Sequence, residues 1–301
     1  MSTGKIMHGN EFNPGGLSSQ KGNNRRRRIF ITIVVLLALI GAELLRSNMY
    51  IQVEEFEYMS KDIPKGFNDA KIVQISDYHN HGGSYDEKLL DKVSEQKPDY
   101  IFLTGDIADS VRTDIPAANA FLEKVSKIAP CYLVWGNHDF DIPSDDLKSM
   151  RECCKQNGIT VLEDTYTTLE RNGSKLMLCG TDTSPDSARW QHTFDTLLPN
   201  QKFVIWLHHY PEDFEEILNQ SAAKSSKADL VFSGHAHGGL IRLPFIGGLY
   251  APGQGFFPKY SAGRYNSGDS TMIVSRGVGN SGYTLRFLDS FHIAVCTLKC
   301  A

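Results

Sequence analysis

Residues 71–109 have the sequence KIVQISDYHNHGGSYDEKLLDKVSEQKPDYIFLTGDIAD, and their pattern of apolar and polar residues indicates the fold class. Its first six residues form an apolar run typical of a buried strand, and residues 86–96 place apolar side chains at helical spacing. Pro98 ends that helix, and residues 100–104 form a second apolar run typical of a strand. Two strands separated by a helix predict a parallel pair joined by a right-handed crossover, which is the unit of an α/β fold.

The same alternation continues towards the carboxyl end, and strands outnumber helices in the second half. Further helices are expected at residues 116–127 and from the capping residue Ser144 to Asn157. Further strands are expected at residues 131–135, 175–179, 203–207, 229–232, 271–275 and 292–298. Residues 238–268 are rich in Gly and Pro, and a loop of that length inside a compact domain predicts a functional role.

Metal-binding residue types follow five of these strands at the point where each strand ends. The five segments are Asp77–His79, Gly105–Asp109, Gly136–Asp139, His208–Pro211 and Gly234–Gly238. Together they contain six of the ten histidines of the chain. In open α/β sheets, ligands bind beyond the carboxyl ends of the strands, so the sequence predicts that these side chains form one site.

The donors in these segments are the carboxylate, amide and imidazole groups of Asp, Asn and His, and none of the segments contains Cys. Such oxygen and nitrogen donors suit divalent Mn, Fe, Zn or Co. In the D-x-H and H-x-H patterns, alternate side chains of an extended segment point the same way, so both can reach one ion. The pattern therefore predicts a site for divalent metals.

Taken together, the five segments resemble the motif set of the calcineurin-like metallophosphoesterase family, which is D-x-H, G-D-x-x-D, G-N-H-[DE], H-x-P and G-H-x-H. All five occur here in the family's order, and the resemblance covers roughly residues 70–300. Residues 234–244 (GHAHGGLIRLP) and 274–282 (VSRGVGNSG) also resemble the exported bacterial branch of the family. The resemblance implies a four-layer αββα sandwich of two mixed β-sheets, with helices outside and the metal site at the carboxyl ends of the strands.

The resemblance also implies a role for each residue of the motifs. Two divalent metal ions are expected, and Asp106 would bridge them. The other ligands would be Asp77, His79 and His237 for the first ion, and Asn137, His209 and His235 for the second. A hydroxide that bridges the ions would attack the phosphoester, and His138 would protonate the leaving oxygen. Asp109 would hydrogen-bond His138 and fix its orientation.

Several side chains near the motifs have open roles on the sequence alone. The H-x-P pattern selects His209 over His208, which leaves His208 a structural role or one behind the ligands. His81 replaces a residue that is small or apolar in the family, and a solvent-facing position is favoured over a contact with substrate. Charge alone points to Arg286 or Arg276 as the group that neutralises the phosphoryl oxygens.

The N-terminal segment predicts a membrane anchor. Residues 25–28 are four arginines, and an apolar run over residues 29–45, interrupted by Glu43, reaches the minimum of about 17 residues for a span. A cleaved signal peptide is the alternative, but the best cleavage position has bulky Ile40 where a small residue is needed. We therefore expect an uncleaved signal-anchor, and the arginines place the following domain outside the cytoplasm.

The expected organisation follows from this anchor. Residues 1–28 are expected to be a disordered basic cytoplasmic tail, residues 29–45 the transmembrane signal-anchor, residues 46–69 a juxtamembrane strand or linker, and residues 70–301 the metallophosphoesterase domain. The chain is 41% hydrophobic and 22% charged, which is ordinary for a globular protein. Its formal charge of −4 offers no basic field, so no nucleic-acid partner is expected.

An external phosphoesterase of this kind is expected to cleave a phosphodiester or pyrophosphate of an envelope lipid or cell-wall precursor. The alternatives are a non-enzymatic membrane receptor on a phosphoesterase scaffold, and a nuclease. A receptor is expected to have lost a ligand or His138, and this sequence retains them all. The six cysteines are expected to stay unpaired, since Cys131, Cys179 and Cys296 lie in apolar strands as small hydrophobic side chains.

Overall fold

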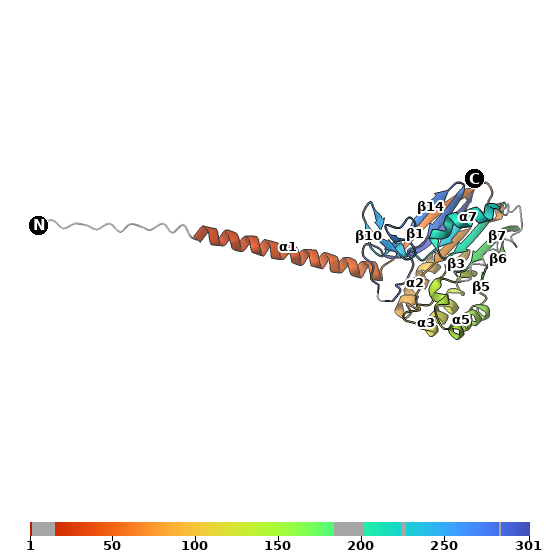
Figure 1. Cartoon of the computed structure of the whole chain (residues 1–301), viewed down its shortest axis with the longest axis horizontal. Helices are drawn as coiled ribbons and strands as arrows, with labels where there is room; N and C mark the ends of the chain where they lie inside the picture. Colours follow the sequence, from red (N-terminus) through yellow and green to blue (C-terminus); the bar gives the residue numbers. More distant parts are fainter. Residues whose placement is uncertain (2–15, 184–201, 224–226, 283) are drawn as a thin grey trace. The chain divides into compact units, whose positions relative to one another are not determined.

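The structure is a computed structural model that describes the chain except for residues 2–15, 184–201, 224–226 and 283 (Figure 1). It consists of two compact units, residues 1–45 and residues 46–301. The first unit contains most of helix α1 (Gly16–Met49). The second unit contains the last turn of that helix and both large β-sheets.

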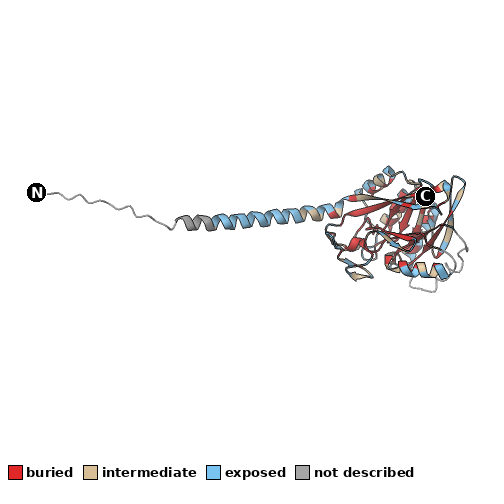
Figure 2. Cartoon of the chain, turned by 90° about the horizontal axis from the view of Figure 1, so that it is seen from above, coloured by how far each residue is buried: buried red, intermediate tan, exposed pale blue. Residues whose placement is uncertain are grey.

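Helix α1 is long and apolar enough to cross a membrane over Asn23–Met49, which has a mean hydropathy of 2.4. A helix of that length extends about 40 Å, compared with about 30 Å for the hydrocarbon core of a bilayer. Most of its apolar residues are exposed, as the pale blue ribbon in Figure 2 shows. The predicted disordered tail differs from the structure, because the helix already begins at Gly16, in a stretch without proline. Residues 2–15 of that tail lie outside the described residues.

Two six-stranded mixed sheets form the second unit, as predicted. The first sheet has the order β1 (Ile51–Ser60), β16 (Phe291–Cys300), β2 (Lys71–Ile75), β3 (Tyr100–Thr104), β4 (Cys131–Val134) and β5 (Thr160–Val161). The second has the order β14 (Gly263–Ser267), β15 (Ser270–Val274), β9 (Leu230–Ser233), β8 (Val204–His208), β7 (Ser174–Thr181) and β6 (Thr165–Arg171). Strands β2 to β5 are parallel, as are β7, β8, β9 and β15. The pairs β16–β2, β14–β15 and β6–β7 are antiparallel.

Helices pack on the outer face of each sheet. The first sheet is covered by α2 (Ser84–Glu95), α3 (Ile115–Val125) and α5 (Ser144–Gln156), and the second by α7 (Phe214–Ala223). A further core lies between the two sheets, which completes the four-layer arrangement. Cys131, Cys296 and Cys179 are buried, one in each of these three cores, as small apolar side chains. The short helices are α4 (Asn137–Phe140), η1 (Lys65–Phe67), η2 (Pro211–Asp213) and η3 (His237–Gly239).

The central strands are buried on both faces, which explains their continuous apolar runs. In β3, Ile101 and Leu103 face the helices, while Phe102 faces the other sheet. In β8, Trp206 faces the helix side and Ile205 faces the first sheet. Because successive side chains of a strand point to opposite faces, every residue of these strands has an apolar neighbour.

Two regions differ from the sequence prediction. The predicted juxtamembrane strand or linker contains β1, which pairs with β16 along its whole length, so the compact unit begins at Arg46 and not at residue 70. Only part of β1 is buried, which makes its apolar pattern weak. The Gly/Pro-rich residues 238–268 form two short hairpins, namely β10 (Arg242–Leu243) with β11 (Gly247–Gly248), and β12 (Tyr250–Ala251) with β13 (Gly255–Phe256).

A buried histidine on β16 links the first sheet to its edge strand. The backbone N–H of Arg276 donates to His292 Nδ1 at 3.3 Å, so the neutral ring carries its proton on Nε2. Nε2 then donates to Glu54 Oε2 on β1 at 3.1 Å. Burial lowers the pKa of His292 to about 4. Between that value and the ordinary pKa near 6.5, the unfolded chain therefore binds a proton that the folded chain does not.

We expect this histidine to make the fold acid-sensitive. Its contribution to the free energy of unfolding is present at pH 7 and decreases by about 2 kcal/mol at pH 5. His292→Gln removes the titrating group, so the stability difference between wild type and variant should shrink over this range. Thermal unfolding of both proteins at pH 7, 6 and 5 measures this difference. A difference that stays constant with pH contradicts the prediction.

Candidate metal centre

The loops that follow β2, β3, β4, β8 and β9 are joined by hydrogen bonds that their backbone N–H groups donate. The N–H of Asp77 donates to Gly105 O at 2.9 Å, which joins the loops after β2 and β3. The N–H of Gly234 donates to His209 O at 3.0 Å, which joins the loops after β9 and β8. The N–H of His235 donates to Asp77 Oδ1 at 3.0 Å and connects the two sheets. The five predicted segments therefore meet at one edge of the sandwich.

Five of the predicted ligands have a left-handed backbone, which residues other than glycine rarely adopt. Their φ angles are 54° for Asp77, 49° for His79, 54° for Asp106, 63° for His235 and 45° for His237. Such strain persists only where the surrounding structure holds it, and it is concentrated at functional sites. The sharp turns let the chain deliver a side chain to the site directly after each strand.

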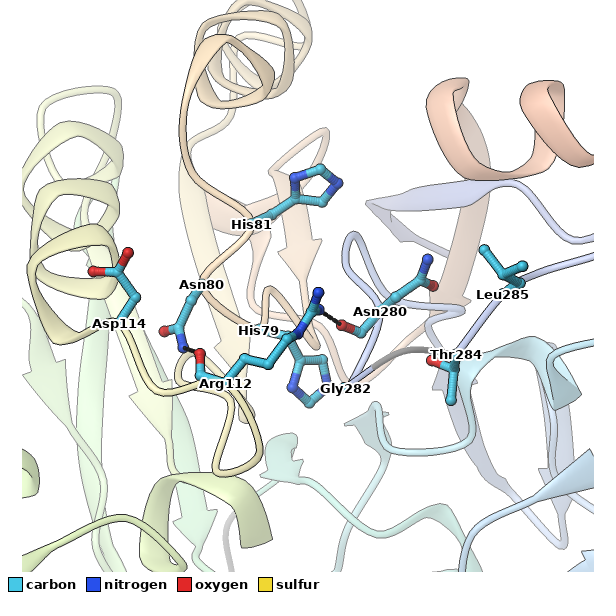
Figure 3. Close-up of a pocket in the computed structure, with 9 residues that line it drawn as sticks. All are labelled: His79, Asn80, His81, Arg112, Asp114, Asn280, Gly282, Thr284 and Leu285. Carbon is cyan, nitrogen blue, oxygen red and sulfur yellow. Dashed lines mark hydrogen bonds between the residues drawn. The ribbon is translucent and has the colours of Figure 1, made fainter.

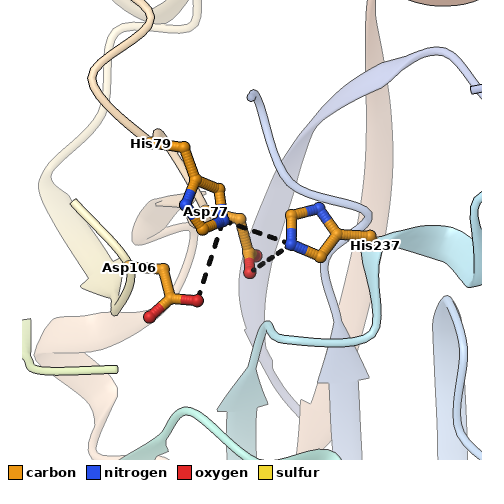
Figure 4. A group of neighbouring side chains, drawn as sticks. All are labelled: Asp77, His79, Asp106 and His237. Atoms are coloured by element: carbon orange, nitrogen blue, oxygen red, sulfur yellow. Dashed lines mark hydrogen bonds and ion pairs between the residues drawn. The ribbon is translucent and has the colours of Figure 1, made fainter. Parts of the chain in front are cut away.

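A first cluster of donors contains Asp77, His79, Asp106 and His237 (Figure 4). His79 Nε2 lies 3.2 Å from His237 Nε2 and 3.7 Å from Asp106 Oδ2. His237 Nε2 lies 3.5 Å from Asp77 Oδ1. The donor atoms of the four residues all lie within 4.8 Å of one another, which is a spacing that one cation can bridge.

A second cluster contains Asp106, His209 and His235, so the two clusters share Asp106. His209 Nδ1 lies 2.7 Å from Thr104 O; because a carbonyl only accepts, Nδ1 carries the proton. Nε2 of the same ring lies 3.2 Å from Asp106 Oδ2. Burial disfavours the charged ring of His209, but Asp106 outweighs burial and raises its pKa to about 10. A proton and a metal ion would therefore compete for Nε2.

Asn137, the remaining predicted ligand, begins α4 directly after Gly136. Gly136 packs so closely on Asp106 that a Cβ atom at this position would collide with the carboxylate. The next residue, His138, donates its backbone N–H to Asp106 Oδ1 at 2.9 Å. The start of α4 is thus held against the carboxylate that both clusters share.

Five of the predicted ligands have a buried polar atom without a hydrogen-bond partner. These atoms are Asp77 Oδ2, His79 Nδ1, Asp106 Oδ2, Asn137 Oδ1 and His209 Nε2. Burying a polar atom without a partner costs free energy, and native proteins rarely leave such atoms unsatisfied. Divalent cations would satisfy oxygen and nitrogen donors of this kind, so the residues present fit a metal site.

Burial also sets the protonation of the clusters. It lowers the pKa of His79 to about 4, that of His235 to about 3 and that of His237 well below its ordinary value. Burial would raise the pKa of Asp106, but the His209 and His79 rings outweigh it and hold this pKa below its ordinary value. Neutral imidazoles beside an ionised carboxylate are in the form that binds metal.

The predicted pair of His138 and Asp109 is close, but the direct hydrogen bond is not formed. His138 Nδ1 lies 3.6 Å from Asp109 Oδ1. Ser110 takes the predicted place, because its backbone N–H donates to His138 Nδ1 at 3.2 Å and its Oγ lies 2.8 Å from the same atom. Asp109 instead accepts from the backbone N–H groups of Val111 and Gly282, which ties the loops together.

The two arginines suggested by charge are not among the residues lining the cavity beside the clusters. Arg286 is fully buried and donates to backbone carbonyls, with Nη2 3.0 Å from His237 Nδ1. Arg276 is also buried and pairs with Asp289. A cavity of about 480 Å³ is lined by His79, and the arginine that lines it is Arg112 (Figure 3). The sequence shows that Arg286 and Arg276 are charged, but it does not show that both pair with buried groups of the fold.

Three further side chains refine the sequence prediction. Asp139 is buried and accepts from the N–H groups of Ala108 and Gly136, and the last position of G-N-H-[DE] was the signal for it. His208 is buried and lies 3.0 Å from Asp213 Oδ2, which is a structural contact away from the donor clusters. His81 is exposed, stacks on Tyr85 at a ring-centroid distance of 3.7 Å and lines the cavity.

Residues 70–239 match the calcineurin-like phosphoesterase family, which covers more than half of the chain. The chain belongs to this family. The uncharacterized metallophosphoesterase YkuE of Bacillus subtilis is similar to it, with 33% identity over 83% of this chain and 86% of that protein. The phosphodiesterase YaeI of Escherichia coli is 31% identical over 64% of this chain and 67% of that protein. A zebrafish transmembrane protein with a metallophosphoesterase domain is 26% identical over 92% of this chain and 64% of that protein.

Membership in the calcineurin-like phosphoesterase family confirms the predicted reaction class. The chain is a metal-dependent hydrolase that acts on phosphoesters. The family uses divalent metals, and the donor clusters of this phosphoesterase are the residues that could hold them. Its N-terminal apolar helix and the similarity to a transmembrane protein agree with a membrane association through one helix.

Proposed function

We propose that this phosphoesterase cleaves a phosphodiester or pyrophosphate bond of an envelope lipid or cell-wall precursor. Two donor clusters that share Asp106 and lie beside a polar cavity are the observation that supports this reaction most directly. Residues 29–45 would anchor the enzyme in the membrane, with residues 1–28 in the cytoplasm and the domain outside the cell. An external domain has access to envelope lipids and wall polymers, which motivates the substrate class.

In this proposal two metal ions bind the shared site. Asp77, His79 and His237 would hold one ion, Asn137, His209 and His235 would hold the other, and Asp106 would be shared by both. Divalent ions of this kind supply Lewis acidity for water activation and for the charge that develops on the phosphoryl group. The imidazole, amide and carboxylate donors are compatible with Mn, Fe, Zn or Co.

His138 is the proposed proton donor to the leaving oxygen. Because the backbone N–H of Ser110 donates to Nδ1, the neutral ring carries its proton on Nε2. Nε2 lies 3.3 Å from Ser281 Oγ, and the His138 ring lies edge-on to His79 at a centroid distance of 4.8 Å. Asp109 Oδ1, at 3.6 Å from Nδ1, would help to fix the orientation of the ring.

Arg112 is the proposed cation for the anionic substrate. Its guanidinium lies at the cavity, 3.5 Å from Asp109 Oδ2 and 3.2 Å from Asn280 O, and is nearly half exposed. We expect Arg112→Gln to lower kcat/KM by about 10- to 100-fold, mainly through KM, because a charge-assisted hydrogen bond to the substrate is lost. Steady-state kinetics on an aryl phosphodiester measures this effect.

The matched control is Arg151→Gln. Arg151 has a comparable exposure and pairs with Glu163 away from the cavity. The Arg151→Gln variant should lose only this surface ion pair and should keep kcat/KM within twofold of wild type. Equal losses in the two variants contradict a substrate contact at Arg112.

The decisive experiment combines metal analysis with hydrolysis assays on the detergent-solubilised full-length chain. We expect two equivalents of divalent metal per chain, cleavage of aryl phosphodiesters or phosphomonoesters, loss of activity with chelator and recovery with added Mn²⁺ or Zn²⁺. A non-enzymatic receptor would bind metal without hydrolysing either probe. A nuclease would degrade DNA or RNA in preference to the aryl esters. Either outcome overturns the proposed function.

A further inference from the structure

The last turn of α1 is hydrogen-bonded into the second unit. Ser47 is fully buried, and its Oγ accepts from the backbone N–H of Asp289 at 3.3 Å. Arg46 Nη1 donates to Ser290 Oγ at 3.1 Å. Both partners lie in the segment between β15 and β16, so the last turn of the membrane-length helix contacts the C-terminal part of the domain.

Asn48 makes the most extensive of these contacts. Its Nδ2 donates to Arg286 O at 2.9 Å, and its Oδ1 accepts from the N–H of the same residue at 3.1 Å. The same Oδ1 accepts from Asn280 Nδ2 at 2.9 Å. The Arg286 side chain in turn binds Asn280, because its Nε donates to Asn280 Oδ1 at 2.8 Å. Asn48, Asn280 and Arg286 therefore form a closed set of hydrogen bonds. One amide side chain therefore holds two residues that are six positions apart.

Both of these residues contact the active site. Arg286 Nη2 lies 3.0 Å from Nδ1 of the predicted ligand His237, and it also donates to Gly279 O at 2.7 Å. Asn280 lines the cavity and accepts from Arg112 through its backbone carbonyl at 3.2 Å. Asn48 is therefore linked to the donor cluster through Arg286 and to the cavity through Asn280.

The segment that Asn48 holds has little regular structure of its own. In its described positions, residues 275–290 contain no helix or strand and only one isolated bridge, between Ile241 and Phe287. Order in such a segment depends on side-chain hydrogen bonds to its neighbours. The Asn48 amide suits this role, since it supplies a donor and an acceptor together.

We propose that Asn48 is a positioning residue for the active site. By holding Arg286 and Asn280, it fixes the imidazole of His237 and the wall of the cavity. The active site thus includes a residue of the turn that continues directly into the anchor, although that turn lies outside the family motifs. The inference rests on the proposed function for its catalytic consequence, but the contacts themselves do not depend on the substrate.

The test compares Asn48→Ala, Asn48→Asp and wild type as full-length chains in detergent. In the metal-free proteins, the backbone amides of residues 276–282 and 284–286 should exchange at least tenfold faster in Asn48→Ala. The exchange rate of strand β3 should be unchanged. Metal retained after dialysis should decrease, with affinity about tenfold weaker, as is typical when a partner behind a metal ligand is removed. KM for an aryl phosphodiester should rise more than kcat falls. Asn48→Asp keeps the acceptor and should recover part of each loss.

Asn119→Ala is the matched control, because Asn119 donates to Ser149 Oγ on the helical face of the domain. It should match wild type in all three measurements. Unchanged exchange and metal retention in Asn48→Ala overturn the inference, as does faster exchange that includes β3, since that indicates general destabilisation. A wild-type chain that hydrolyses no phosphoester refutes the proposed function instead, while the exchange and metal measurements still decide the role of Asn48.

Discussion

Asp106→Asn is expected to release metal from both donor clusters and to lower kcat/KM by at least about a thousandfold. Asp106 is the one residue that the two clusters share, and its Oδ2 is buried without a hydrogen-bond partner. The amide has nearly the same size but no charge, so each ion loses an anionic ligand. Losing several kcal/mol of charge stabilisation in the transition state corresponds to a rate loss of this order.

Metal analysis after dialysis, combined with steady-state kinetics, measures both effects. Asp114→Asn is the matched control: Asp114 lines the cavity beside the clusters, and its Oδ1 caps α3 by accepting from the N–H of Ala117 at 3.0 Å. Asn is an equally good N-cap, so this variant should keep its metal and its activity. Retention of two equivalents of metal in Asp106→Asn contradicts the bridging role.

His138→Ala is expected to keep both metals and to lose turnover by about 10²- to 10⁴-fold, the usual contribution of a positioned proton donor. His138 belongs to a third group of donors, with His79 and Asp109, and not to the two clusters that share Asp106. Its backbone N–H, which contacts Asp106 Oδ1, is retained in the variant. The loss should therefore fall on the chemical step and not on metal binding.

The leaving group distinguishes proton donation from a packing role. A nitrophenolate leaves without protonation, whereas a phenolate or alkoxide leaves poorly without it. The loss in His138→Ala should therefore be several-fold larger for a phenyl ester than for a nitrophenyl ester. His81→Ala, which removes an exposed imidazole lining the cavity beside His79, should show no such difference. Equal losses for both esters, or loss of metal, would rule out the proton-donor role.

The motif residues could be predicted because they follow from local patterns. Strands such as β3 are mainly apolar, and polar steps such as Gly105-Asp106 and Gly136-Asn137 follow these runs. Parallel strands deliver such steps to one edge, so convergence at that edge follows from topology. Strand β1 was predicted only as a strand or linker. Most of its side chains are only partly buried, which weakens the alternation of apolar and polar residues along the strand.

The reaction class could be inferred from the sequence, because donor types and their spacing lie within short segments. Which charged side chains lie at the cavity depends on tertiary packing. Arg286 is buried behind His237 while Arg112 lies at the cavity, and Ser110 replaces Asp109 as the hydrogen-bond partner of His138. These outcomes depend on partners far apart in the chain, such as Asn48 and Arg286, which are 238 positions apart. Local patterns carry no information on such pairs, because contact between them is created only when the sheets and loops pack.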